Sequence, residues 1–159
     1  MKSLFDWKGH ALLALCARLY LAFVFLLACY HKILHPQAFA IDIATYQIVP
    51  LALVNLMAIV LPWVELASGL TLLGGWRTRA AALLTGGMMV MFIIALSIAL
   101  HRGLDISCGC FASQGAVEDP ISWRTIARDS SWLLLSLYVL VFDRAPIGID
   151  GWLAGRRSP

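Results

Sequence analysis

The sequence predicts an all-α membrane protein in which four transmembrane helices form one bundle. Of its 159 residues, 61% are hydrophobic and 13% are charged, whereas soluble domains are roughly half apolar and a quarter charged. Four apolar segments have about the 20 residues that a helix needs to cross a bilayer. These segments and their short connections nearly fill the chain, so we expect a single membrane domain over residues 1–159.

The elements are expected to be helices because lipid cannot satisfy exposed backbone amides, and the alternating pattern of a membrane barrel is not seen. Between the first two spans, Pro36–Pro50 is apolar with few charges, so we expect a short helix along the membrane surface that caps the bundle. The tail from Asp143 to Pro159 is expected to be a polar, weakly ordered end. The four predicted spans cover residues 11–30, 51–73, 80–100 and 123–142.

The distribution of Lys and Arg predicts that both termini are cytoplasmic. Lys32, Arg102 and Arg124 fall on the other side of the membrane, and two further cations fall within spans. Cytoplasmic loops carry the excess of Lys and Arg, so the loop after the third span lies outside, in a periplasm. We therefore expect a multi-pass protein of the bacterial inner (cytoplasmic) membrane. The seven remaining cations lie on the side of the termini: Lys2, Lys8, Arg77, Arg79, Arg144, Arg156 and Arg157.

Cys108 and Cys110 flank one glycine in the loop that follows the third span. A disulfide across one residue closes a small ring, and strained disulfides tend to be labile and oxidising. The pattern favours a redox-active pair at the outer membrane boundary. Two alternatives stay open: a structural disulfide to another cysteine, and a soft-metal site for Cu(I) or Hg(II). Zinc is disfavoured because its sites usually have four ligands at wider spacing.

Cys29 lies at the outer end of the first span, at the level of the Cys-Gly-Cys loop. The neighbouring Lys32, or a protonated His31, would make this thiol more reactive. We therefore treat Cys29, Cys108 and Cys110 as candidate catalytic residues. Cys16, in the inner part of the same span, is expected to pack as a small hydrophobe.

Charged residues inside the predicted spans are candidates for ion pairs or function. Arg18 and Glu65 lie roughly 10–12 Å from the cytoplasmic face at the helical rise, so we expect them to pair, either as a clamp or as a proton or headgroup site. Arg128 and Asp129 are sequence neighbours on one helix and are expected to need separate partners. Arg128 either snorkels to the interface or lies against the Cys108 loop.

Several stretches together resemble the DoxX-like family of membrane proteins. They are RLYLAFVF from residue 18, HKILHP from residue 31, LPWVELASGL from residue 61 and GWRTRAA from residue 75. Within that group, CGCF from residue 108 followed by SWRTIARD from residue 122 is similar to the MauE branch, the methylamine utilisation proteins. The resemblance covers roughly residues 15–142.

The resemblance implies a four-helix membrane bundle with a part in electron transfer or thiol–disulfide handling. For the MauE branch it implies maturation of the disulfide-rich small subunit of methylamine dehydrogenase beside a thioredoxin-like partner, and for DoxX-like relatives it implies quinone-linked oxidation of sulfur compounds. Cys29 stands where the family has a glycine, and Asp129 where asparagine is usual. Family-typical positions are occupied by Arg18, Lys32, Glu65, Cys108, Cys110 and Arg128.

We therefore expect a membrane thiol–disulfide redox protein that exchanges with a periplasmic thioredoxin-fold or cysteine-rich partner, with a quinone as the candidate cofactor by analogy. The alternatives are a non-catalytic membrane assembly or anchor subunit and a soft-metal (Cu/Hg) carrier. Contact with membrane lipid is expected, and nucleic-acid binding is not, because the loops carry few cations. No nucleotide-binding motif is present. The candidate cofactor-binding residues are Arg18, Glu65, Lys32, Arg128 and His31.

Overall fold

The computed structural model describes residues 9–109, 120–143 and 148–155. Within these residues four helices are long and apolar enough to cross a membrane, which confirms the predicted all-α, four-helix fold class. The last span begins and ends where the sequence predicted, and the first is longer than predicted at its outer end. The four are α2 (His10–Leu34), α4 (Leu51–Gly74), α5 (Thr78–His101) and α6 (Trp123–Phe142).

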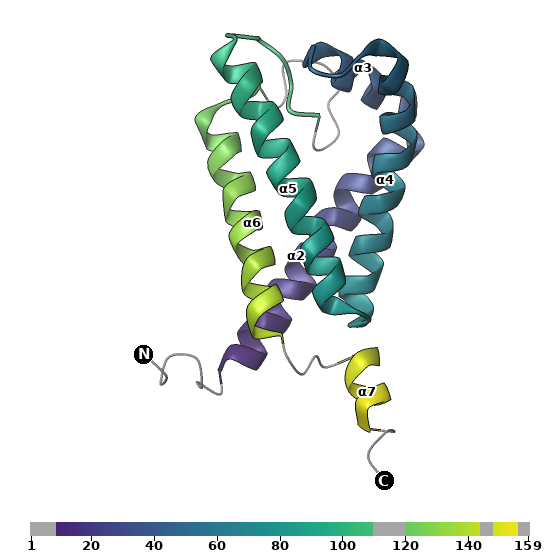
Figure 1. The fold of residues 1–159 in the computed structure, drawn as a ribbon, viewed down its shortest axis with the longest axis vertical. Helices are drawn as coiled ribbons and strands as arrows, with labels where there is room; N and C mark the ends of the chain where they lie inside the picture. Colours follow the sequence, from purple (N-terminus) through teal and green to yellow (C-terminus); the bar gives the residue numbers. More distant parts are fainter. Residues whose placement is uncertain (1–8, 110–119, 144–147, 156–159) are drawn as a thin grey trace.

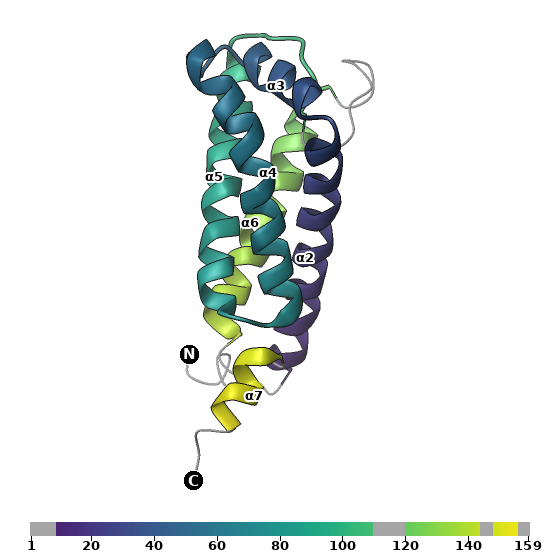
Figure 2. The ribbon, with the colours of Figure 1, turned by 90° about the vertical axis from the view of Figure 1, so that its right-hand side faces the viewer.

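The four long helices stand side by side in one bundle (Figures 1 and 2), in which α2 packs against α4 and α6, and α5 packs against α6 and α4. The short helix α3 (Pro36–Thr45) lies across one end of the bundle, as predicted, and the segment leading to Cys108 reaches the same end (Figure 1). We call this the loop end. Helix α2 begins and α6 ends at the opposite end, which we call the terminal end.

Local sequence signals explain where the helices begin and end. Pro36 occupies the first turn of α3, where its missing N–H costs no hydrogen bond. Helix α4 ends at Gly75, which adopts the left-handed conformation (φ +65°) that glycine tolerates best. The amides of Gly75 and Trp76 then donate to the carbonyls of Leu72 and Thr71, a Schellman-type end. This turn joins α4 to α5 directly.

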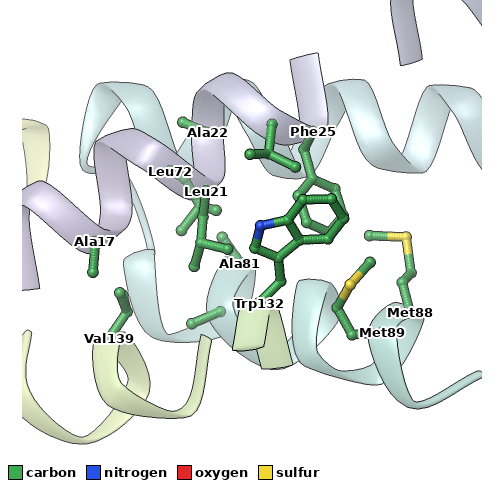
Figure 3. Packing of buried hydrophobic residues seen from close by; sticks show 12 residues of the cluster. Ala17, Leu21, Ala22, Phe25, Leu72, Ala81, Met88, Met89, Trp132 and Val139 are labelled. Atoms are coloured by element: carbon green, nitrogen blue, oxygen red, sulfur yellow. The ribbon is translucent and has the colours of Figure 1, made fainter. Parts of the chain in front are cut away.

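The core is built from apolar side chains of all four long helices. Figure 3 shows the Trp132 indole of α6 lying beneath Phe25 of α2 and beside Met89 of α5, and these residues belong to one buried cluster. The Trp132 Nε1–H donates to the hydroxyl of Tyr20 at 3.3 Å, so its polar atom is satisfied. The bundle is therefore a packed core that fixes α6 against α2 and α5.

The tail contains a helix, α7 (Ile149–Gly155), where the sequence predicted a weakly ordered end. The backbone amide of Asp150 donates to the carbonyl of Gly75 at 3.0 Å, and its carboxylate accepts a hydrogen bond from the amide of Thr78 at 3.3 Å. Asp150 thus satisfies an orphan donor at the start of α5. The prediction was wrong for these residues because it considered only their polar composition. The contacts that order them are made with the turn between α4 and α5, which is distant in the sequence.

Arg18 pairs with Asp143 at the terminal end, so the predicted Arg18–Glu65 pair is wrong. Arg18 Nη1 donates to Asp143 Oδ2 at 3.2 Å, and both side chains are buried. Asp143 follows directly after α6. Burial raises the pKa of Asp143, and the Arg18 guanidinium offsets part of that rise. The tail residue Asp143 therefore supplies the anion that the sequence reading looked for on α4.

Candidate functional site

The Cys108 segment is held at the loop end by backbone contacts with residues 120–121 and by the side chain of Tyr46. The amide of Ile121 donates to the carbonyl of Ile106 at 3.0 Å, beside an antiparallel bridge between Ser107 and Pro120. The Tyr46 hydroxyl, just beyond α3, donates to the carbonyl of Cys108 at 2.8 Å. These contacts fix the backbone on which Cys108 sits.

Gly109 is required by this backbone. Its φ of +65° lies in the left-handed region, and a Cβ added there would stand 3.0 Å from the Cβ of Asp42. Asp42 belongs to α3, so α3 and the Cys-Gly-Cys segment approach each other more closely than a side chain at residue 109 would permit. The glycine between the two cysteines thus serves both conformation and packing.

Cys108 is disulfide-bonded, whereas Cys16 and Cys29 are free thiols. Cys110 lies outside the described residues. Cys108 is 4% exposed, and Arg128 Nη2 donates to its Sγ at 3.5 Å. Of the two placements considered for Arg128, the structure supports the one against the Cys108 loop. A guanidinium at this distance favours a negative charge on sulfur.

Arg128 also binds its sequence neighbour, so the prediction of separate partners for Arg128 and Asp129 is wrong. Arg128 Nε donates to Asp129 Oδ1 at 3.2 Å. The long Arg side chain folds back over its own helix, with its guanidinium 5.0 Å from the ring centre of Trp132. Asp129 is fully buried and holds the guanidinium that faces Cys108.

Lys32 and Glu65 form the second buried ion pair of the described residues. Lys32 Nζ donates to Glu65 Oε1 at 2.7 Å, with side chains 5% and 3% exposed. The ammonium also lies over the rings of Phe39 and Phe92, 4.9 and 5.3 Å from their centres. Such contacts stabilise a desolvated cation.

The helices are staggered, which explains why the depth estimate chose the wrong partner for Glu65. Lys32 lies two residues before the end of α2, whereas Glu65 lies fourteen residues, about 21 Å, after the start of α4. Figure 2 shows α2 ending lower in the view than the start of α4. The depths of Arg18 and Glu65 were counted from the ends of their own spans, on the assumption that the two helices end at the same height in the bundle. The displacement of α2 relative to α4 cannot be read from either span alone.

Two cavities adjoin these residues. A cavity of about 20 Å³ between α2, α4, α5 and α6 is lined by three charged residues, Lys32, Glu65 and Asp129. A larger cavity of about 440 Å³ lies between α3, α4 and α5 and has Cys108 in its wall. Phe92 lines both cavities. The three charged side chains of the small cavity and Cys108 of the larger cavity therefore lie on two sides of the Phe92 ring.

The larger cavity is almost entirely apolar. Val90 and Ile94, which line it, are also exposed on the outer face of α5, so the cavity opens toward the lipid. Gly87 lines it as well, and no atom lies within 4 Å of a Cβ built there. The shape suits an apolar molecule that enters from the membrane.

The remaining predicted site residues, Cys29, His31 and Arg18, do not line either cavity. Cys29 is buried and donates its thiol hydrogen to the Leu26 carbonyl at 3.2 Å. The His31 ring packs against His35, with ring centres 4.7 Å apart, and lines neither cavity. Arg18 binds Asp143, which directly follows the end of α6. Cys16, which was expected to pack as a small hydrophobe, is exposed on the surface of α2. Among the described residues, no three His, Cys, Asp or Glu side chains gather as a metal site would need.

Sequence reasoning missed two residues of the site, Asp42 and Tyr46. One signal was available for Asp42, because it is the sole charged residue of Pro36–Pro50. A lone charge in a segment that caps a membrane bundle often faces a polar group of the protein. Tyr46 carries no such signal, since a tyrosine at a membrane interface is common.

The fold and the site together define a multi-pass helical membrane protein with a disulfide-bonded, cation-flanked cysteine at one end of the bundle. The chain belongs to the MauE family, because the family model described as "Methylamine utilisation protein MauE" matches residues 10–142. It is accordingly a multi-pass bacterial membrane protein. The DoxX-like grouping stays a prediction.

Three curated relatives, each named "Methylamine utilization protein MauE", are similar to the chain. The protein from Paracoccus denitrificans is 29% identical over 145 residues, covering 87% of this chain and 77% of the relative. The protein from Methylorubrum extorquens is 32% identical over 117 residues, covering 71% and 62%. The protein from Methylophilus methylotrophus is 31% identical over 139 residues, covering 87% and 71%. No solved structure matches the chain.

Proposed function

We propose that this protein is a membrane thiol–disulfide redox protein that exchanges through Cys108 and Cys110. One observation carries the proposal: Cys108 is disulfide-bonded, with the Arg128 guanidinium 3.5 Å from its sulfur. Because Cys16 and Cys29 are free thiols, we assign Cys110 as the bonding partner. A cation beside a sulfur stabilises the thiolate that forms when the bond opens, which speeds its departure.

The proposed exchange consumes one dithiol and produces one disulfide. A thiolate of the partner attacks the Cys108–Cys110 bond, a mixed disulfide forms, and the second partner thiol displaces it. The partner becomes a disulfide, and the pair on this protein becomes two thiols. The family description and the relatives' names support placing this partner, a thioredoxin-fold or cysteine-rich protein, in a methylamine utilisation system. The Lys/Arg bias favours the periplasmic side.

We further propose that the cavity of about 440 Å³ holds a membrane quinone that regenerates the disulfide. The residues fit such a ligand, because Phe39, Tyr46 and Phe92 provide flat apolar walls and the opening faces lipid. Cys108 lies in the cavity wall, so the sulfur that is to be reoxidised adjoins the ligand. When bound, a quinone would accept two electrons and two protons from the dithiol.

Trapping the mixed disulfide tests the thiol chemistry. The partner bonds to Cys110, because Cys108 is the sulfur that leaves. With Cys108→Ser, the sulfur that would release the partner from Cys110 is missing, so the adduct formed when the Cys110 thiol attacks the disulfide of the oxidised periplasmic partner should accumulate and disappear on reduction. Cys16→Ser is the matched control, since that free thiol is exposed on the outer face of α2. No adduct, together with unchanged oxidation of the partner, contradicts the proposal.

Filling the cavity tests the quinone step separately. Gly87→Leu should slow reoxidation of the reduced protein by decylubiquinone at least tenfold, while exchange with a water-soluble dithiol stays unchanged. Leu83→Trp adds bulk to the same helix at an exposed position that lines neither cavity, and serves as the control. Equal reoxidation rates in the two variants would remove the quinone from the proposal and leave the thiol exchange standing.

A non-catalytic assembly or anchor subunit is the second candidate function, because most of the described surface is apolar helix. Its discriminator is the variant in which Cys108 and Cys110 are both Ser. Full function in that variant favours the anchor. A soft-metal carrier is tested by copper and mercury binding, which Cys108→Ser should abolish if that candidate is correct.

A further inference from the structure

We propose that Glu65 is a buried proton-binding site linked to the redox state of Cys108, taking up a proton when the disulfide is reduced. This inference rests on the proposed thiol–disulfide function. It concerns four charged residues of α2, α4 and α6, namely Lys32, Glu65, Arg128 and Asp129. We call them the charged cluster.

Glu65 has a carboxylate oxygen available for a proton. Its Oε1 accepts the hydrogen bond from Lys32, whereas its Oε2 is buried and has no hydrogen-bond partner among the described residues. Glu65 also lines the cavity of about 20 Å³, which is large enough to hold one water molecule. Lys32 and Asp129 line the same cavity and supply polar partners for that water. A water held in this cavity would lie beside all three charged side chains, Glu65 among them.

The charges that face Glu65 balance one another when Cys108 is oxidised. Helix α2 presents the Lys32 ammonium and the free thiol of Cys29. Helix α6 presents Asp129 with the Arg128 guanidinium behind it. Helices α3 and α5 present Phe39 and Phe92 to the Lys32 ammonium, and the Asp42 carboxylate of α3 lies beside Gly109 and lines the larger cavity with Cys108. The two cations and two carboxylates of the charged cluster then sum to zero in a region that screens charge poorly.

Reduction of the disulfide adds one negative charge to this balanced region. The Cys108 sulfur faces Arg128 at 3.5 Å, so it is the sulfur that stays a thiolate, while its former bonding partner takes a proton. The step is balanced when a partner dithiol, the disulfide of Cys108 and the Glu65 carboxylate yield a partner disulfide, the Cys108 thiolate, one thiol on its former bonding partner and the Glu65 carboxylic acid. Two electrons and both partner protons are accounted for, and the charged cluster with the Cys108 thiolate is again neutral.

Glu65 is a better proton acceptor than Asp129 because of their different partners. The Arg128 guanidinium binds Asp129 directly at 3.2 Å and, unlike an ammonium, does not give up its proton in proteins. That contact keeps Asp129 ionised and aims the guanidinium at the sulfur. The proton is therefore taken up by Glu65, although Asp129 is the carboxylate that binds the guanidinium next to the sulfur.

Redox-induced infrared difference spectroscopy on the full-length protein tests the inference, with dithiothreitol as the reductant. Reduction should produce a carbonyl band of a protonated carboxylic acid, which shifts to lower frequency in D₂O. The band should be lost in Glu65→Gln and kept in Asp143→Asn, whose carboxyl is buried in the ion pair at the other end of the bundle. The D₂O shift is read on the native protein and does not depend on how well any variant folds.

The pH dependence of the disulfide midpoint potential is the second readout. Native protein should take up one proton more per two electrons than Glu65→Gln does. No acid band in the native protein, or a band that survives in Glu65→Gln, overturns the inference while the thiol exchange stands. A disulfide that dithiothreitol does not reduce overturns both the inference and the proposed function.

Discussion

Replacing Lys32 with methionine tests the buried ion pair that joins α2 to α4. The ammonium lies 2.7 Å from Glu65 Oε1, and both side chains are at most 5% exposed. At an effective dielectric constant of about 20, two unit charges at this distance attract by about 6 kcal/mol, much of which offsets desolvation. Removing one partner of a buried pair typically costs about 3–5 kcal/mol, because the other stays buried. We expect Lys32→Met to lower the free energy of unfolding by about 3 kcal/mol.

A double-mutant cycle measures the pairing itself. Reversible unfolding in mixed detergent micelles gives the free energies for Lys32→Met, Glu65→Gln and the double variant. We expect the double variant to be less destabilised than the sum of the singles by about 2 kcal/mol, since contacting pairs couple by about 0.5–3 kcal/mol. The control cycle pairs Arg18→Met with Glu65→Gln and should be additive within about 0.5 kcal/mol, because Arg18 binds Asp143.

The two cycles separate the observed pairing from the one that helix depth suggests. Additivity for Lys32 and Glu65, together with coupling between Arg18 and Glu65, would refute the staggered arrangement of α2 and α4. It would also remove the charge balance on which the proton-uptake inference depends.

Three further predictions follow from single contacts. Gly109→Ala should destabilise the Cys108 segment by about 1–2 kcal/mol and speed its proteolysis, because its φ of +65° is unfavourable for any residue with a Cβ. Arg128→Gln should slow disulfide exchange with dithiothreitol about tenfold or more, since a hydrogen bond to a charged group contributes about 1.5–3 kcal/mol, while the exposed Arg124→Gln should not. Burial raises the pKa of Asp143, so the folded state binds the proton of this carboxyl more tightly than the unfolded state does. The free energy of unfolding should therefore fall as the pH rises above about 3.9. In Asp143→Asn this dependence of the free energy of unfolding on pH should be smaller.

The membrane spans were predictable from the sequence because each is a local property of about 20 consecutive residues. The predicted range 123–142 coincides with α6, and the cap over residues 36–50 contains α3. The position of Cys108 at the end opposite the start of α2 also followed, because three long helices, α2, α4 and α5, lie between them in the chain and Cys108 binds Tyr46 next to α3. These features need no knowledge of which helices touch.

The ion pairs were not predictable in the same way. Arg18 and Glu65 match in depth along their own helices, yet each binds another residue, because α2 and α4 are displaced along the bundle axis. The Arg128–Asp129 contact depends on how a flexible guanidinium folds back over its helix, a choice that helical spacing does not contain. The partner of Arg18 lies in a tail whose polar sequence gave no sign of burial.

The amino-acid sequence alone determines which segments are long and apolar enough to cross a membrane and at which end of the bundle the cysteine loop lies, because hydrophobic length and alternating helix direction are properties of each segment. The relative positions of the packed helices determine which charged residues pair, where the apolar cavity opens beside Cys108, and that Arg128 faces the sulfur of Cys108. Lys32 and Glu65 are more than thirty positions apart in the sequence, so their contact depends on how α2 and α4 pack. The cavity depends in the same way on how α3, α4 and α5 pack together.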